Sequence, residues 1–409
     1  MRLIVRKTER LSGTVAAPAS KSHTHRAIVS ASLAEGKSAI LNPLACDDTA
    51  ATIEACRLFG AGIAAGGEAL EITGFAGRPK VPKSDIHVGD SGTTLRLMAG
   101  IAALCDGAAT LTGTPGLCAR PMDPLLRSLA DLGAKRSKSL RNDGCAPVCV
   151  GGRMSGGATK LDAQSSQFVS ALLIACPLAE NDSVIDADGV RSRPYVDLTL
   201  KHLERSGIKV WSRDGARFFV PGGQSYAPAD FAVPGDWSSA AFLRAAAIVT
   251  CSDIEVLGLD SEDGQGDRAF SSMAEKIMSG NGTTLDLGDT PDLLPALAVV
   301  ACCAEGETAL GNVGHARMKE SDRISAMCTE LRKMGAEIEE LPDGLLVRGS
   351  ELKGAELDGH GDHRIAMALA VAGLAAEGET IINNAHVISK SYPDFARDLA
   401  GLGADIRAV

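Results

Sequence analysis

A sixfold internal repeat constrains the fold of this chain more than any other feature of its sequence. Each copy has a Gly/Ser/Asp-rich turn, an Ala-rich helical stretch, a short β-branched strand, a second helical stretch and a further strand. Each second helical stretch ends at a glycine, the residue that best adopts the left-handed conformation of a helix C-cap. The copies recur at about 70 residues, with one shorter interval of about 55. The six glycines are Gly60, Gly133, Gly207, Gly280, Gly335 and Gly403.

The first strand keeps the same place in every copy. Units of this kind cannot bury their apolar faces alone, so neighbouring copies must stack on one another. A chain of 409 residues exceeds the usual size of one core, and two domains with three copies each are expected. The expected strands are 38–42, 109–113, 183–187, 253–258, 308–312 and 380–384.

Two segments have the composition of extended linkers between these domains. Residues 15–21 (VAAPASK) and 232–237 (AVPGDW) both place a proline next to small residues. The N-terminal strand MRLIV would then return to the second domain, and the chain would cross twice. The expected domains are therefore 20–234, and 1–19 together with 235–409.

The composition excludes several classes of protein. A net charge of −10 disfavours a polyanion-binding surface, and 3% aromatic residues argue against stacking on nucleic-acid bases. Eleven cysteines without CxxC pairs indicate reduced thiols, most of them in the core. The first ten residues lack the apolar segment of a signal peptide. The apolar run at 293–304 is too short to span a bilayer, and a buried helix is expected there. A cytoplasmic protein without nucleic-acid or membrane partners is expected.

The openings of the six first helices leave backbone N–H groups available to anions. Helix N-termini attract anions because unsatisfied donors and the positive end of the dipole coincide there. In an acidic chain, the opening ASKSHTHRAI nevertheless gathers Lys21, His23, His25 and Arg26 within six residues. The other openings are GDSGTTLRL, AQSSQFVSAL, PGDWSSAAFL, DTPDLLPAL and GDHRIAMAL.

Basic residues cluster at these openings, and RMKESDR is the most informative segment. Lys319 and Arg323 lie four residues apart, on one face if the segment is helical, where like charges destabilise a helix. An anion between them is one interpretation, and a surface segment in which Glu320 or Asp322 pairs with Arg323 is the other. The further basic residues are Lys21, Arg26, Arg96, Arg120, Arg193, Arg364 and Lys390.

Simpler interpretations apply to several other residues taken singly. Ser165 and Asp292 have the positions of ordinary helix caps. His23 and His25 lack a third ligand at a convincing spacing, so no metal site is expected. Gly92 could mark either a turn that requires positive φ or a place where backbone approaches a ligand.

Taken together, nine segments resemble the enolpyruvyl transferases, and closely the EPSP synthase (3-phosphoshikimate 1-carboxyvinyltransferase) family. The resemblance implies two inside-out α/β domains, each of three βαβαββ units with pseudo-threefold symmetry, joined by two crossings. That fold agrees with the sixfold repeat. The segments span nearly the whole chain in the family's order: ASKSHTHRA, GDSGTTLRLM, LTGTPGLCARPMDPL, SSQFVSALL, SRPYVDLT, TPDLLPALA, RMKESDRI, GDHRIAMALA and SKSYPDF.

The same resemblance implies the reaction and its residues. The family transfers the enolpyruvyl group of phosphoenolpyruvate to the 5-hydroxyl of shikimate 3-phosphate, through a tetrahedral adduct that loses phosphate. Asp292 matches the base and Glu320 the acid, with Lys21 as a further catalytic residue. The implied shikimate 3-phosphate ligands are Lys21, Ser22, Arg26, Ser165, Ser166, Gln167, Ser192, Tyr195, Asp292, His315 and Lys319. The implied phosphoenolpyruvate ligands are Lys21, Gly92, Arg120, Gln167, Arg323, Arg364 and Lys390.

The resemblance implies no cofactor and no metal, because side chains hold the anions, and a monomer with small-molecule substrates is expected. Many family members have Asn where this chain has His25, Asp90 and His315. Two alternatives stay open. The sister enzyme that acts on UDP-N-acetylglucosamine uses a loop cysteine, and Cys118 lies in the corresponding region. A non-catalytic anion-binding protein of the same fold is the other, although both Asp292 and Glu320 are present.

Overall fold

The chain divides into two compact units in the computed structural model, which describes all 409 residues. The N-terminal unit is Ala19–Pro234, and the C-terminal unit joins Met1–Pro18 to Gly235–Val409. Each unit has its own hydrophobic core. The chain passes between the units after Pro18 and after Pro234, within the two proline-containing segments.

The N-terminal unit consists of three four-stranded sheets and six α-helices. Its helices are α1 (Lys21–Leu33), α2 (Asp47–Phe59), α3 (Gly92–Ala102), α4 (Asp123–Asp131), α5 (Ser166–Ala175) and α6 (Arg193–Arg205), with 3-10 turns η1 (Leu117–Ala119) and η2 (Cys176–Leu178). Its strands are β3 (Lys37–Leu41), β4 (Gly62–Gly66), β5 (Ala69–Thr73), β6 (Ile86–His87), β7 (Ala108–Thr112), β8 (Lys138–Ser139), β9 (Val148–Gly151), β10 (Gly157–Asp162), β11 (Ser183–Asp188), β12 (Trp211–Arg213), β13 (Arg217–Val220) and β14 (Phe231–Ala232).

The C-terminal unit contains the other six α-helices. They are α7 (Trp237–Val249), α8 (Phe270–Met278), α9 (Leu294–Cys302), α10 (Arg323–Lys333), α11 (His363–Ala375) and α12 (Phe395–Gly401), with 3-10 turns η3 (Gly266–Ala269), η4 (Pro291–Leu293), η5 (Gly314–Met318) and η6 (Ala385–Lys390). Its strands are β1 (Leu3–Arg6), β2 (Ser12–Ala16), β15 (Asp253–Leu257), β16 (Thr283–Asp286), β17 (Glu307–Gly311), β18 (Glu337–Leu341), β19 (Gly344–Arg348), β20 (Glu356–Asp358), β21 (Glu379–Asn383) and β22 (Ile406–Ala408).

All five four-stranded sheets have the same design. A parallel pair is followed by two antiparallel strands, as in the order β6-β7-β9-β8. A parallel pair that is consecutive in the chain requires a crossover helix, and in four of the five sheets the Ala-rich first helix of the copy connects the pair. The exception is β14-β3, because β14 lies far from β3 in the sequence. The expected α/β fold with βαβαββ units is therefore confirmed. The other four sheets are β10-β11-β13-β12, β14-β3-β5-β4, β16-β17-β19-β18 and β20-β21-β1-β22.

The strands near the two crossings pair with strands of repeat copies that lie far away in the sequence. The N-terminal strand β1 fills the last sheet, where it pairs with β21 and β22. β2 precedes α1 in the sequence but pairs with β15, and β14 precedes α7 but pairs with β3. The β15-β2 sheet has two strands only, because α8 leads directly to β16 without a hairpin. This missing hairpin explains the short interval between Gly280 and Gly335.

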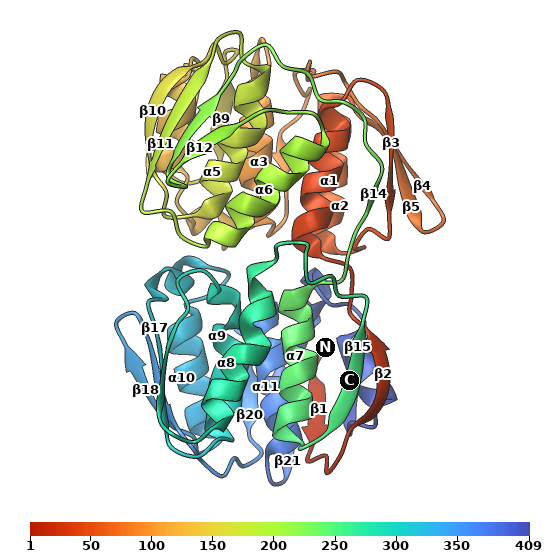
Figure 1. Cartoon of the computed structure of the whole chain (residues 1–409), viewed down its shortest axis with the longest axis vertical. Coiled ribbons are helices and arrows are strands. Elements are labelled where there is room, and N and C mark those ends of the chain that lie inside the picture. The colour runs from red at the N-terminus through yellow and green to blue at the C-terminus, as the bar shows by residue number, and fades with distance from the viewer. The chain divides into compact units, whose positions relative to one another are not determined.

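The first helix of each copy lies inside its unit, with the sheets outside (Figure 1). α3, α5, α9 and α11 are buried on almost every side, which explains why their sequences are apolar all round rather than amphipathic. The apolar run at 293–304 is largely α9, a core helix as expected. No helix in the chain combines the length and the apolarity that crossing a membrane requires.

The six repeat glycines all have positive φ, between 71° and 114°. After five of them, the next residue donates its N–H to the carbonyl five residues earlier, as Ala61 does to Cys56. This is the Schellman pattern, in which the left-handed residue ends the helix. The predicted helix ends are therefore confirmed.

Candidate active site

The N-termini of the three inner helices of the N-terminal unit lie near one another. Gln167 Nε2 at the start of α5 donates to Thr93 Oγ1 of α3 at 3.0 Å. Thr94 Oγ1 of α3 donates to the carbonyl of Asp48 in α2 at 3.3 Å, and Lys21 of α1 pairs with the Asp48 carboxylate. Several helix dipoles therefore present their positive ends, which favour anions, in one region of this unit.

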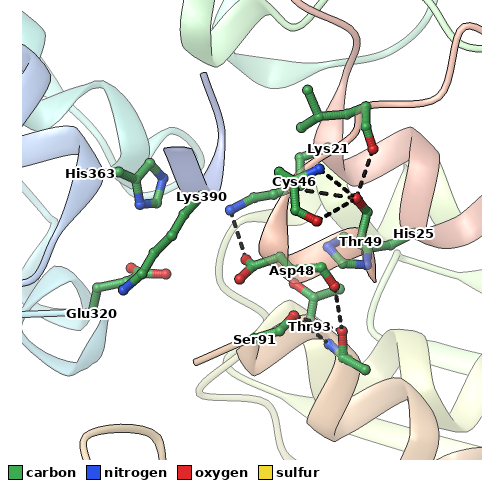
Figure 2. Close-up of polar contacts among 12 residues, drawn as sticks. Lys21, His25, Cys46, Asp48, Thr49, Ser91, Thr93, Glu320, His363 and Lys390 are labelled. Atoms are coloured by element: carbon green, nitrogen blue, oxygen red, sulfur yellow. Dashed lines mark hydrogen bonds and ion pairs between the residues drawn. The ribbon is translucent and has the colours of Figure 1, made fainter. Parts of the chain in front are cut away.

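Lys21 is held in this region by an ion pair. Its Nζ lies 3.1 Å from Asp48 Oδ2, and both side chains are more than four-fifths buried (Figure 2). Asp48 lies in the first turn of α2, where a carboxylate also stabilises the helix dipole. The sequence reasoning missed Asp48, although the pair Asp47-Asp48 before a helical stretch was a signal for such a position.

The other charged member of the opening segment, Arg26, is 3% exposed and bonds to protein groups. Its guanidinium donates to Thr199 Oγ1 at 2.8 Å, to the Tyr195 carbonyl at 2.9 Å and to the Ser22 carbonyl at 3.0 Å. A longer contact of 3.4 Å reaches Ser170 Oγ. Burial lowers the pKa of Arg26 to about 10. In this structure, Arg26 therefore ties α1 to α5 and α6.

The two histidines of the opening segment are buried within the unit. His25 Nδ1 lies 2.7 Å from Thr52 Oγ1, and burial, reinforced by Lys21 and Arg26, lowers its pKa well below the ordinary value. His23 Nδ1 lies 2.9 Å from His202 Nε2. Burial likewise lowers the pKa of His202 well below its ordinary value, with His23 a smaller cause. The positive charge of the segment therefore comes from Lys21 and Arg26, not from His25.

The predicted serines and Tyr195 lie at the starts of α5 and α6. Ser165 accepts from the backbone N–H of Gln167 at 3.3 Å, so its capping role is confirmed. Ser166 is the first residue of α5. Ser192 precedes α6 in the left-handed conformation, with φ at 53°, a strained position for a residue with a Cβ.

Gly92 is the first residue of α3 and does not have positive φ, so the turn interpretation was wrong. An added Cβ would lie 2.6 Å from Arg96 Nη1 and 3.1 Å from Arg120 Nη1. Gln167 Oε1 would be 3.7 Å away. Two guanidinium groups therefore lie against the bare backbone at a helix N-terminus, which is the arrangement of an anion-binding site.

In the C-terminal unit, Asp292 is surrounded by cations. Its carboxylate lies 2.5 Å from Arg323 Nη1, 3.1 Å from Arg364 Nη2 and 3.8 Å from Lys319 Nζ. Burial tends to raise the pKa of Asp292, but these cations outweigh it, with Arg364 foremost, and hold the pKa well below the ordinary value. Asp292 is therefore an ionised carboxylate in this structure.

Arg323 is the centre of this charged cluster and is 1% exposed. Besides Asp292, it bonds to Glu320 Oε2 through Nη2 at 2.7 Å and to Asp362 Oδ2 through Nε at 2.7 Å. Burial tends to lower the pKa of Arg323, but the three carboxylates outweigh it and raise the pKa well above the ordinary value. Glu320 therefore does pair with Arg323, as one of the two interpretations held, although the Arg323 side chain is buried and only Glu320 is partly exposed.

Lys319 and Arg323 do not share a helix, so they do not lie on one helical face. α10 begins at Arg323, whereas Lys319 directly follows the preceding 3-10 turn η5. The anion shared by the two cations is Asp292, which comes from the start of another copy. Asp322 caps α10 and pairs with Arg317 rather than with Arg323.

The other predicted residues of this unit lie around the same cluster. Arg364 follows Asp362, whose side chain caps α11 by accepting the Arg364 N–H at 2.9 Å. Lys390 ends η6 and donates to the Gly361 carbonyl at 3.2 Å. His315 lies in η5, and its Nε2 is buried. The sequence reasoning missed Asp362, although it occupies the cap position in the opening GDHRIAMAL.

A second carboxyl group, Asp267, lies buried near Asp292. It is 2% exposed and accepts a hydrogen bond from Ser238 Oγ at the start of α7. Burial raises the pKa of Asp267 to about 6, with the negative charge of Asp292 as a second cause. No pattern in the sequence pointed to this residue.

Replacing Asp267 by Asn should make the protein relatively more stable as the pH rises. Because the folded-state pKa of Asp267 is raised to about 6, the folded chain keeps a proton that the unfolded chain has released. Its contribution to stability is therefore full in acid and is lost between about pH 4 and pH 7. Asn has no such loss. The free energy of unfolding of the variant should therefore rise relative to that of wild type by up to about 3 kcal/mol over this range.

Urea unfolding from pH 4 to pH 8 measures this difference. Ser238→Ala provides the matched control, because it removes the hydrogen bond that lowers the pKa of Asp267. In this variant the loss of stability should therefore occur at a higher pH than in wild type. Parallel pH profiles for wild type and Asp267→Asn would contradict the expectation.

Comparisons with known proteins show the family to which the chain is similar. A family model described as EPSP synthase (3-phosphoshikimate 1-carboxyvinyltransferase) matches residues 5–399. The chain is 45% identical to the 3-phosphoshikimate 1-carboxyvinyltransferase of Acetivibrio thermocellus, with 99% of both chains covered. It is 46% identical to that of Methanocella arvoryzae, with 96% of this chain and 97% of the relative covered.

A solved structure of EPSP synthase from Acinetobacter baumannii is also similar, with a TM-score of 0.84 and 26% identity over 99% of both chains. The family model extends over both units, and its range includes the residues around Arg323. The chain therefore belongs to the EPSP synthase (3-phosphoshikimate 1-carboxyvinyltransferase) family.

Proposed function

We propose that this protein transfers the enolpyruvyl group of phosphoenolpyruvate to the 5-hydroxyl of shikimate 3-phosphate and releases phosphate. Its relatives bear the name of this activity. The observation that carries the proposal is the cluster around Arg323, which contacts Asp292 at 2.5 Å and Glu320 at 2.7 Å. The reaction needs two proton-transfer groups, and one guanidinium holds two carboxylates together.

Each unit supplies part of the proposed binding groups. Cations and backbone N–H groups at helix starts suit the phosphates and the carboxylate of the two substrates. For shikimate 3-phosphate the proposed ligands are Lys21, Ser22, Arg26, Ser165, Ser166, Gln167, Ser192 and Tyr195 in the N-terminal unit, and Asp292, His315 and Lys319 in the C-terminal unit. For phosphoenolpyruvate they are Lys21, Gly92, Arg120 and Gln167, and Arg323, Arg364 and Lys390.

The proposed chemistry consists of two proton transfers and one elimination. Asp292 takes the proton of the 5-hydroxyl, whose oxygen attacks the enolpyruvyl carbon, and Glu320 gives a proton to the methylene carbon. The resulting tetrahedral adduct loses a proton from its new methyl group and releases phosphate. Lys21 and the arginines stabilise the charge that these steps move. No step requires a metal or an organic cofactor, and a cytoplasmic monomer is proposed.

Phosphate release with two alternative acceptors tests the function. We expect rapid release from phosphoenolpyruvate with shikimate 3-phosphate and none with UDP-N-acetylglucosamine. The reverse preference would contradict the proposal in favour of the sister enzyme. Cys118 argues against that reverse, because it is 5% exposed and its thiol lies 3.5 Å from the Gly113 carbonyl rather than at the surface.

Replacing Gly92 by Ala should weaken phosphoenolpyruvate binding with little effect on the fold. The backbone at Gly92 is compatible with alanine, but the methyl group would meet Arg96 Nη1 and Arg120 Nη1. We expect a loss of roughly 1 to 3 kcal/mol in binding, by analogy with overpacked interiors. Glyphosate, the family's inhibitor at this site, should lose more because it is longer, and shikimate 3-phosphate should change little.

Calorimetric titration of the three ligands against wild type and variant measures these effects. Gly116→Ala is the matched control, because an added methyl group there meets no atom within 4 Å. Unchanged phosphoenolpyruvate and glyphosate affinities, or a collapse of thermal stability, would return Gly92 to a purely structural role.

A further inference from the structure

We infer that Glu330 is a positioning residue for the proposed enolpyruvyl transfer. It anchors the segment 358–362, and this segment holds in place the side chains of the C-terminal unit that are proposed to bind phosphoenolpyruvate. The inference rests on the proposed function for the identity of the ligand. Glu330 itself lies two helical turns from Arg323 and contacts none of the proposed substrate ligands other than through this segment.

Glu330 is a carboxylate in a buried position, with its side chain 1% exposed. Burial by itself would raise its pKa, but hydrogen bonds from Lys333, His360 and the Asp358 backbone lower the pKa below the ordinary value. A buried charge is retained only when it is paired and hydrogen-bonded. The hydrogen-bond partners of Glu330 are therefore the groups that its buried charge can hold in place.

Two of these contacts reach the segment 358–362. Glu330 Oε2 accepts the backbone N–H of Asp358 at 3.1 Å, and Oε1 lies 2.7 Å from His360 Nε2. The third partner, Lys333, lies on the same helix three residues later and bonds both oxygens at 2.8 Å. Lys333 compensates the charge, whereas Asp358 and His360 connect the charge to another element.

α10 binds the other end of the same segment through Arg323. Arg323 Nε donates to Asp362 Oδ2 at 2.7 Å. Seven residues separate Arg323 from Glu330, so the two side chains lie on one face of α10, two turns apart. One helix face therefore grips a five-residue segment at both ends, with an arginine at one and a glutamate at the other.

The anchored segment reaches each phosphoenolpyruvate ligand proposed for this unit. Asp362 caps the helix that carries Arg364, and the Gly361 carbonyl accepts from Lys390 Nζ at 3.2 Å. Asp358 Oδ2 accepts from Asn384 Nδ2 at 2.8 Å, and Asn384 precedes η6, which ends at Lys390. Loosening the Asp358 end should therefore displace Arg364 and Lys390 together.

The kinetic signature should be specific to one substrate. Glu330→Ala removes the hydrogen bonds of Glu330 to Asp358 and His360, which are its two anchors on the segment. This change should raise the KM for phosphoenolpyruvate about ten- to a hundredfold, because small displacements of binding groups have effects of this size. The KM for shikimate 3-phosphate should change much less, since most of its proposed ligands lie in the N-terminal unit. A role limited to stability would not distinguish the two substrates.

Conservative replacements should restore the function in part. In Glu330→Gln the amide oxygen still accepts the Asp358 N–H, so the KM for phosphoenolpyruvate should lie between those of wild type and Glu330→Ala. His360→Gln keeps a donor for Glu330 and should resemble wild type, whereas His360→Ala should resemble Glu330→Gln. Lys333→Ala is the matched control, because it removes a partner of Glu330 and leaves both anchors.

Amide hydrogen exchange of residues 359–364 in the substrate-free protein supplies a readout independent of catalysis. Exchange should be faster in Glu330→Ala and His360→Ala than in Lys333→Ala. If wild type shows no enolpyruvyl transfer, the proposed function fails, and exchange alone decides the anchoring. Unchanged exchange in both Glu330→Ala and His360→Ala would overturn the inference. Equal increases in both KM values in an active enzyme would also overturn it.

Discussion

An Asp292→Asn variant should bind both substrates and turn over about two to four orders of magnitude more slowly than wild type, the usual range for a general base. Asn cannot take the proton of the attacking hydroxyl. Its amide oxygen can still accept from Arg323 Nη1, which lies 2.5 Å from Asp292 Oδ1. The fold should therefore survive a change that removes the base.

The charges around Asp292 add a condition to this role. Arg364, Lys319 and Arg323 hold its pKa well below the ordinary value, so Asp292 is a weak base in the structure described here. The same three cations are proposed ligands of substrate phosphate and carboxylate groups. Bound anions would compete with Asp292 for them, and its basicity should rise when both substrates are present.

Steady-state phosphate release and calorimetric binding separate the two effects of the Asp292→Asn change. Because kcat reports the substrate-bound enzyme, the acid limb that Asp292 contributes to the pH profile of kcat should disappear in the variant, since Asn does not titrate. Near-normal turnover of a folded Asp292→Asn protein would remove Asp292 from the mechanism.

The repeat architecture could be predicted from the sequence because its signals are local. A left-handed glycine ends each second helix, and all six glycines adopt positive φ. The long apolar run at 293–304 indicated a buried helix, and it is largely the core helix α9. Even the short interval had a simple local cause, the missing hairpin after α8.

The partners of the charged residues could not be predicted in the same way, because they come from distant parts of the chain. The spacing of Lys319 and Arg323 suggested an anion between them as one interpretation, but it could not identify Asp292, 31 residues before Arg323. The burial of individual charged side chains could not be predicted from the sequence either. Arg26 was expected to face a phosphate, and in the structure its guanidinium bonds to α5 and α6.

Glu330 shows the same limit more clearly. It lies within the helical stretch that ends at Gly335, where a glutamate is typical of a solvated surface. Its partners Asp358 and His360 are 28 and 30 residues later in the chain. Only the packing of α10 against the segment 358–362 gives this residue a connection to the proposed ligands.

A Glu320→Gln variant should also lose about two to four orders of magnitude in turnover, but at a different step. Glu320 is proposed to give the proton to the methylene carbon, and an amide cannot act as that acid. The amide oxygen of the variant can still accept from Arg323 Nη2, the 2.7 Å contact of Glu320. Substrate affinities should therefore stay close to those of wild type.

Reaction in deuterium oxide distinguishes this variant from Asp292→Asn. Protonation of the methylene carbon creates a methyl group, and its later loss of a proton leaves solvent deuterium in the enolpyruvyl product. Because this carbon is protonated only when the adduct forms, a folded Glu320→Gln protein should slow phosphate release and deuterium incorporation together. Glu320→Asp should recover part of both, since it restores an acid on a shorter side chain. Glu340→Gln, which changes a half-exposed glutamate paired with Arg317, should leave both rates unchanged. Normal deuterium incorporation in Glu320→Gln would assign the acid to another group, of which Lys21 is the remaining proposed catalytic residue.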